Sequence, residues 1–340
     1  MNKRDALRWP RIESTEKWLL GVIAALCVFL SLTTDTFLTL VNFADILNYS
    51  AVSIIFAAGL LVVLIAGGID ISFAVAASVV QYLVALTVMQ LGGGNWAVGF
   101  VLATAYGFCL GAINGALIHH LRIISIIVTI ATFNIYFGGL MYFTEGRSIY
   151  FLPDWWVDRV IVLEHETAMG YAEITLPVVV MVVAVALTWL LLRRLNVGRQ
   201  LFAMGDNPEG ARRLGINIAA MHYLAYGWLG AMAGIAGLMQ AHYAQEVVPN
   251  ALYGRELEVL AAVVLGGARL GGGRGTLLGA VLGLMLITLT RNGLTLMGIS
   301  PYAFKMIVGG IILVAIALSN EGMSMLVERV RSARLAGGSR

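Results

Sequence analysis

Runs of about 20 mostly apolar residues follow one another along nearly the whole chain, and they constrain its fold more than any other feature. A helix of that length crosses the hydrocarbon core of a bilayer and satisfies its own backbone hydrogen bonds there. The alternating segments of about ten residues typical of a membrane β-barrel are not evident. Only 12% of the 340 residues are charged, whereas a soluble domain carries about 25%. We therefore predict an all-α integral membrane protein.

Hydropathy predicts about ten membrane-spanning helices. The expected spans are 18–35, 44–67, 71–90, 96–118, 123–143, 174–195, 219–241, 256–268, 275–292 and 302–320. An even number of spans places both termini on one side of the membrane. With both termini cytoplasmic, most of the 22 Lys and Arg residues lie on the cytoplasmic side, in agreement with the positive-inside rule. The first run is interpreted as a retained helix, because no small-residue cleavage motif follows it.

The spans divide the chain into a membrane domain and two short tails. The expected parts are a cytoplasmic tail 1–17, a membrane domain 18–320 with an outer loop 144–173 and a cytoplasmic loop 196–218, and a cytoplasmic tail 321–340. Trp155 and Trp156 in the outer loop are interpreted as aromatic anchors at the membrane interface. A small amphipathic element on the outer surface, on which a soluble partner docks, is the alternative.

The segment "GRQLFAMGDNPEGARRLGIN", residues 198–217, is a polar island between apolar runs. Its pattern predicts a short ordered helix whose defining residues are Asp206, Asn207, Pro208, Glu209, Gly210, Ala211, Arg212, Arg213 and Gly215. The first two are candidate caps, the proline suits the first turn, and the glutamate complements the helix dipole. The last glycine is a natural stop. An ordinary basic loop is the alternative, since cytoplasmic loops are rich in arginine.

Two further stretches lie on either side of this island. The first is "AGGIDIS" at 66–72. The second is "ELEVLAAVVLGGARLGGGRGTLLGAVLG" at 256–283, which is followed by "RNGLTLMGIS" at 291–300. Together the three stretches resemble the signatures of permease subunits in binding-protein-dependent ABC importers of the ribose type. That family includes pentose, hexose and autoinducer-2 systems. The resemblance extends over residues 18–320. The chain departs from the usual "GIDLSVG" at Phe73 and Ala74, which leaves the substrate open.

The resemblance implies a multi-pass subunit of the bacterial inner membrane, in which the polar island couples transport to a cytoplasmic ABC ATPase. That partner, with two fused cassettes, would bind ATP and Mg, so this chain is expected to hold no cofactor. A periplasmic sugar-binding protein would deliver the ligand, and a second copy or a related permease would complete the pathway through the lipid. The chain's own sequence agrees, because it contains no G-x-x-x-x-G-K-[ST] phosphate loop. No catalytic residue and no nucleic-acid partner are expected.

The expected span 256–268 is short, because about 13 helical residues extend only roughly 20 Å. We therefore predict a discontinuous or re-entrant helix around 256–275. The glycines expected to act as a hinge there are Gly266, Gly267, Gly271, Gly272 and Gly273. Close helix packing is an equal alternative for them, and it is favoured for Gly275, Gly279 and Gly283, which recur every four residues.

Polar and aromatic residues within or beside the spans are candidates for a substrate pathway or gate. They are Asp70, Ser72, Phe73, Asn114, Thr132, Asn134, Gln240 and Asn292. Such polar groups more often join helices by hydrogen bonds than contact a substrate. Asp70 and Ser72 are expected near the inner membrane edge, where capping of the next helix is favoured over ligand contact. Glu258 is expected to pair with Arg255 or Arg291.

The alternative function is an ion-coupled secondary transporter of a small polar solute. Such a transporter needs ionisable residues deep in the membrane, and this chain has few of them. A metal site is not expected either. His119 and His120 are adjacent, and neighbouring helix positions do not face one another.

Overall fold

The computed structural model describes residues 14–310 except 301, 305 and 308. The expected tails 1–17 and 321–340, and the expected span 302–320, lie wholly or largely outside the described residues. In chain order the elements are α1 (Ser14–Thr33), α2 (Leu40–Ile65), α3 (Phe73–Gln90), α4 (Trp96–Leu121), α5 (Ser125–Thr144), α6 (Asp154–Val157), β1 (Ile161–Thr167), β2 (Gly170–Thr175), α7 (Leu176–Arg193), α8 (Asn196–Asp206), α9 (Pro208–Arg213), α10 (Ile218–Ala244), α11 (Arg255–Leu265) and α12 (Leu277–Leu296).

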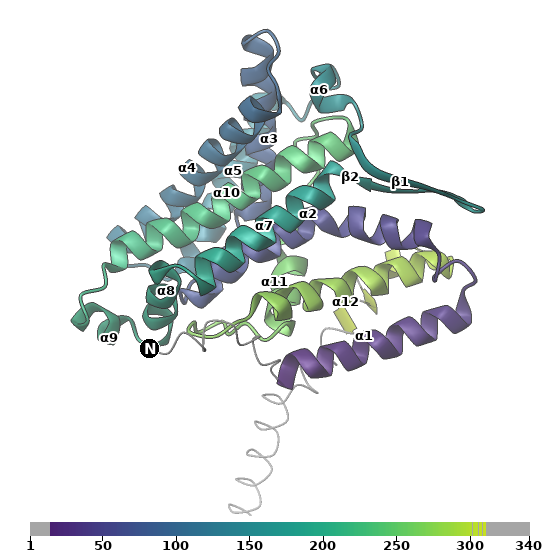
Figure 1. The fold of residues 1–340 in the computed structure, drawn as a ribbon. Helices are drawn as coiled ribbons and strands as arrows, with labels where there is room; N and C mark the ends of the chain where they lie inside the picture. The colour runs from purple at the N-terminus through teal and green to yellow at the C-terminus, as the bar shows by residue number, and fades with distance from the viewer. Residues whose placement is uncertain (1–13, 301, 305, 308, 311–340) are drawn as a thin grey trace, which may run out of the picture.

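Seven of the described helices are long and apolar enough to cross a membrane: α1, α2, α3, α4, α5, α7 and α12. The prediction of a mostly helical, multi-pass membrane protein is thereby confirmed, whereas the count of ten spans stays a prediction. Helix α10 has 27 residues and is also long enough to cross. In Figure 1 the α8–α9 pair lies at one end of the long helices, and α6 and the β1–β2 hairpin lie at the other end.

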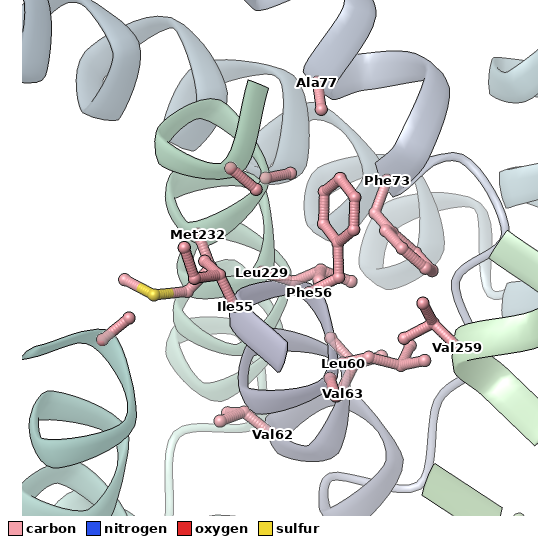
Figure 2. Packing of buried hydrophobic residues seen from close by; sticks show 14 of the residues in the cluster. Ile55, Phe56, Leu60, Val62, Val63, Phe73, Ala77, Leu229, Met232 and Val259 are labelled. Atoms are coloured by element: carbon pink, nitrogen blue, oxygen red, sulfur yellow. The ribbon is translucent and has the colours of Figure 1, made fainter. Parts of the chain in front are cut away.

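Helix α2 forms the centre of the structure. It is buried almost continuously from Ser50 to Ile65, because its sequence is apolar on every face and not along a single stripe. Figure 2 shows side chains of α3, α10 and α11 packed around it, among them Phe73, Leu229 and Val259. The rings of Phe56 and Phe73 are 5.1 Å apart at 58°. The other helices are therefore positioned around α2.

Helices α4 and α10 pack backbone against backbone through glycines. A Cβ added to Gly111 would lie 2.1 Å from the carbonyl oxygen of Tyr226, and one added to Gly230 would lie 2.1 Å from the carbonyl oxygen of Gly107. Small residues at such spacing allow helices to approach closely in a membrane, where no hydrophobic force draws them together. The start of α10 is thereby fixed beside the end of α4.

The expectation of a wholly helical chain is wrong in the outer loop, where β1 and β2 form an antiparallel hairpin. The segment contains several β-branched and aromatic residues, among them Val162, Tyr171 and Ile174, and only Ala168 and Met169 connect its strands. The hairpin is joined to α2 by Asn48, whose Nδ2 donates to the carbonyl oxygen of Glu173 at 2.7 Å and whose Oδ1 accepts from the amide of Thr175 at 3.1 Å.

The interpretation of Trp156 as an interfacial anchor is also wrong. Its side chain is fully buried, and its Nε1 donates to the carbonyl oxygen of Leu238 at 3.1 Å. The neighbouring Trp155 is half-buried and lies edge-on to Trp96, with ring centroids 5.1 Å apart. A tryptophan inside the protein cannot contact lipid headgroups, so Trp156 joins the outer loop to α10. Sequence alone missed this because both roles require an aromatic ring with one polar atom.

Candidate functional site

The polar island folds into two short helices, α8 and α9, that meet at Asn207. The Oδ1 atom of Asn207 accepts a hydrogen bond of 2.9 Å from the amide of Gly210, which confirms the predicted cap. Asp206, the other candidate cap, ends α8 instead. Gly215 has a φ of +81°, which confirms it as the stop after α9. The loop is therefore an ordered helical element.

Helix α9 presents charged side chains outward and buries Ala211 on its inner face. Glu209 lies 3.6 Å from both Arg212 and Arg213, and these three side chains are 61%, 67% and 79% exposed. Ala211 faces inward with 2% exposure. Leu214 is 80% exposed immediately after the helix. Helix α9 therefore exposes a charged face that is followed by one large apolar side chain.

Three segments far apart in the sequence meet at glycines beneath α8. A Cβ added to Gly205 would lie 1.9 Å from the carbonyl oxygen of Ile65 and 2.6 Å from the amide of Gly273. A Cβ added to Gly272 would lie 2.6 Å from the Cα of Gly67. We call these five residues the glycine junction. It brings the end of α2, the end of α8 and the loop after α11 into direct backbone contact.

Close packing accounts for three of the five glycines expected to form a hinge. Gly266 packs on α12, where an added Cβ would lie 2.2 Å from the carbonyl oxygen of Gly279, and Gly272 and Gly273 belong to the glycine junction. Gly267 faces Thr15, and an added Cβ at Gly271 would meet only Arg269. The predicted packing role is confirmed for Gly275, Gly279 and Gly283, whose added Cβ atoms would lie within 2.9 Å of Leu61, Gly266 and Ala262.

Helix α11 has only 11 residues. At 1.5 Å per residue it extends roughly 16 Å, about half of a bilayer core. The chain then continues without regular structure from Gly266 to Thr276, with left-handed φ values at Gly267, Gly272, Gly273 and Gly275. The short helix and its irregular continuation match the expected discontinuity in this region.

A cavity of about 800 Å³ opens beside the α8–α9 pair. Its lining comes from the loop after α2, the end of α4, α8 and α9, and the start of α10. Arg122, Arg212, His119, His120 and His222 contribute to it. The histidine side chains do not form a metal site, since the described part of the chain holds no suitable group of three ligands. Sequence analysis did not identify this cavity, because its walls come from separate helices.

Asp70, Ser72 and Asn114 form a buried polar cluster. Asn114 Nδ2 donates to Asp70 Oδ2 at 3.1 Å and to Ser72 Oγ at 2.8 Å, while Ser72 Oγ donates to Asp70 Oδ1 at 2.7 Å. The exposed fractions are 2%, 1% and 1%. Asp70 is therefore buried within the protein, and its position near the inner membrane edge stays a prediction. Ser72 is the N-cap of α3 but makes no capping bond with its side chain, because its hydroxyl bonds to Asp70.

The other pathway candidates do not converge on one place. Phe73 is a core residue against Phe56, and Thr132 is buried with its hydroxyl donating to the carbonyl oxygen of Thr129. Asn134 is exposed on α5 and Gln240 is half-buried on α10. Asn292 exchanges hydrogen bonds with Asn42, which joins α12 to α2. The structure thus brings only Asp70, Ser72 and Asn114 together.

A charged contact joins α11 to α12. Arg291 lies 2.6 Å from Glu258, one of the two pairings that the sequence left open. Sequence analysis missed the third member, Tyr49 of α2, whose hydroxyl accepts a hydrogen bond from Arg291. Glu256, at the start of α11, is buried and accepts from the amide of Gly254 at 3.0 Å.

Comparisons with known proteins place the chain among transporter subunits. A family model described as "Branched-chain amino acid transport system / permease component" matches residues 42–317. The galactose/methyl galactoside import permease protein MglC of Salmonella typhimurium is 29% identical, and the match covers 94% of this chain and 97% of that protein. The autoinducer 2 import system permease protein LsrC of Photorhabdus luminescens is 30% identical over 91% of each chain.

The ribose import permease protein RbsC of Escherichia coli is 28% identical, and the match covers 90% of this chain and 96% of that protein. No solved structure matches the chain. The family model covers most of the sequence and includes all three motifs that carry the resemblance. The chain therefore belongs to this family of transport-system permease components.

Proposed function

We propose that the chain is the translocation subunit of an ATP-driven importer, through which a periplasmic binding protein passes a small sugar or sugar-like polyol across the bacterial inner membrane. The relatives support this substrate class, because their names specify galactosides, ribose and autoinducer 2. The subunit would have ten spans with both termini cytoplasmic. It would pair with a second copy or with a related permease.

The observation that carries the proposal is the ordered α8–α9 pair seated on the glycine junction. A cytoplasmic ATPase, with two fused cassettes that hold ATP and Mg, would bind the exposed face of α9. Movement of α9 would pass through α8 to Gly205. Since Gly205 contacts α2 and the loop after α11 through backbone atoms, those two elements would have to move with it.

The substrate would move between the two permeases at a site of low affinity. Such a site need not bind tightly, because the soluble binding protein supplies the affinity. The buried cluster of Asp70, Ser72 and Asn114 would hold the loop between α2 and α3 in place. The loop after α11, which contacts Gly205 of α8, would form the part of the gate that moves with α9.

The test is to purify the native complex from membranes with a tag on this chain, then to measure uptake in vesicles. We expect a two-cassette ATPase to co-purify and uptake to require ATP inside the vesicle and the binding protein outside. Uptake that vesicles containing only this chain sustain from an ion gradient would reject the proposal in favour of secondary transport.

A further inference from the structure

The cavity beside α8 and α9 has a cationic lining, and Arg212 is the one basic residue of it that also belongs to the proposed docking face of α9. Arg122 and Arg212 lie on it, together with His119, His120 and His222. Asp206 is the single carboxylate of the lining, and its side chain is exposed at the rim, where solvent screens it. We propose that this cavity binds a phosphate-bearing anion, either the headgroup of an anionic phospholipid or a free phosphorylated solute.

Arg122 occupies a position that favours glycine. It is the C-cap of α4 with a φ of 56°, in the left-handed region that costs an L-residue free energy. Its side chain is exposed, and none of the ion pairs in the described part of the chain includes it. A glycine would relieve the strain but would remove the guanidinium. The arginine therefore supplies a free, positioned cation at the mouth of the cavity.

Two other groups face the cavity with hydrogen-bonding capacity to spare. Arg212 makes one ion pair, with Glu209 at 3.6 Å, and a guanidinium has five N–H donors. His222 is half-buried and also lines the cavity. A neutral imidazole has one N–H donor, and a ligand oxygen can accept from it.

A phosphate group fits these donors better than a carboxylate does. A guanidinium binds either group through two N–H donors, but a phosphate carries more acceptor oxygens and can carry more negative charge, which suits a lining with two arginines. The inner wall of the cavity is apolar at Ile118 and Met204, both buried, so it can accept the start of an acyl chain. Basic pockets between helices near the cytoplasmic surface are suited to lipid headgroups.

The consequence for transport rests on the proposed function. The cavity lies between the end of α4 and the α8–α9 pair, so a bound anion would bridge Arg122 to Arg212 and resist movement of α9. An occupied cavity would therefore lower ATP hydrolysis by the complex in the absence of substrate. The binding itself needs only this chain.

The test measures binding to the purified full-length chain by native mass spectrometry. The probes are phosphatidylglycerol and phosphatidylcholine with the same acyl chains, and inorganic phosphate is tested separately by thermal shift. The variant is R122Q/R212Q, and the matched control is R213Q, which removes the neighbouring charge on α9 but does not line the cavity. We expect phosphatidylglycerol affinity to fall by roughly tenfold or more in the variant and to stay unchanged in the control.

Preference for phosphatidylglycerol identifies the lipid as the source of the phosphate, and stabilisation by inorganic phosphate alone identifies a soluble source. Equal loss in R213Q, or no discrimination among the probes, overturns the site. Unchanged phosphatidylcholine binding and elution volume show that the variant is folded. The second variant is R122Q alone, and its affinity for phosphatidylglycerol should lie between those of the unmodified chain and the double variant. Transport that proves independent of an ATPase while anion binding persists rejects the proposed function and leaves the anion site standing.

Discussion

The amide nitrogen of Gly273 donates a hydrogen bond of 2.9 Å to the carbonyl oxygen of Ile65, the last residue of α2. The last carbonyls of a helix have no partner within the helix, so the loop after α11 completes the end of α2 across 208 positions of the chain, from 65 to 273. Gly205 packs against both residues of this bond. The end of the central helix is thereby tied to the segment that we propose to bind the ATPase.

Replacing Gly205 with alanine tests this contact. The new Cβ would lie 1.9 Å from the carbonyl oxygen of Ile65 and 2.6 Å from the amide nitrogen of Gly273. Both of these atoms belong to the backbone and cannot rotate away. We expect a loss of about 1–3 kcal/mol in unfolding free energy, measured as a lower melting temperature, together with loss of ATP-dependent uptake. The matched control is Gly21→Ala in α1, where an added Cβ meets nothing within 4 Å. Normal stability and transport in G205A would show that the three segments are not in close contact.

Removing the amide of Asn114 from the buried polar cluster should lower the stability of the folded protein. Asn114→Leu keeps the approximate side-chain volume but leaves the Oδ2 atom of Asp70 without its donor. We expect a destabilisation of about 1–3 kcal/mol or more. Asn134→Leu is the control, since Asn134 is exposed and bonds only to a carbonyl of its own helix.

The exchanged variant Asp70→Asn/Asn114→Asp separates a paired contact from two independent effects. It retains one carboxylate and one amide in the cluster, so part of the loss in melting temperature should be recovered relative to the sum of the two single variants. If the loss of melting temperature in the exchanged variant equals the sum of the losses in the two single variants, the side chains at positions 70 and 114 do not interact.

The Arg291–Glu258 pair should contribute more to stability than an exposed pair. Its side chains are 26% and 27% exposed, whereas those of Arg147 and Glu145 are 79% and 66% exposed. Because partial burial reduces screening, we expect a coupling energy of about 1–2 kcal/mol for the first pair and well below about 1 kcal/mol for the second. Double-mutant cycles by thermal unfolding at low and high salt measure both. Equal coupling energies for the two pairs would contradict the prediction.

Arg213→Glu tests the docking surface of α9 without altering the cavity lining. The side chain is 79% exposed, so the free energy of unfolding should change by no more than about 0.5 kcal/mol. Charge reversal on a docking face should nonetheless abolish substrate-stimulated ATP hydrolysis by the assembled complex. Arg147→Glu, equally exposed in a different loop, should leave hydrolysis unchanged. Full hydrolysis in R213E would show that this face of α9 does not contact the ATPase.

The features that were predictable from sequence depend on residues that are close together along the chain. Apolar runs of sufficient length set the long helices, because the bilayer demands internally bonded backbone. The cap at Asn207 and the stop at Gly215 were equally readable, since each depends on bonds or dihedral angles within a few residues. The motifs also indicated the family, which the comparisons confirmed.

The hairpin, the burial of Trp156 and the burial of Asp70 were not predictable in this way. The buried Asp70 lies in the loop between α2 and α3, and one of its hydrogen-bond donors is Asn114, 44 positions later on α4. The glycines of 266–275 were equally compatible with hinge and packing roles until their distances to α2, α8 and α12 were known. Local sequence fixes which backbone conformation a segment adopts. Which distant backbone it touches depends on how the helices pack, and only the tertiary structure decides that.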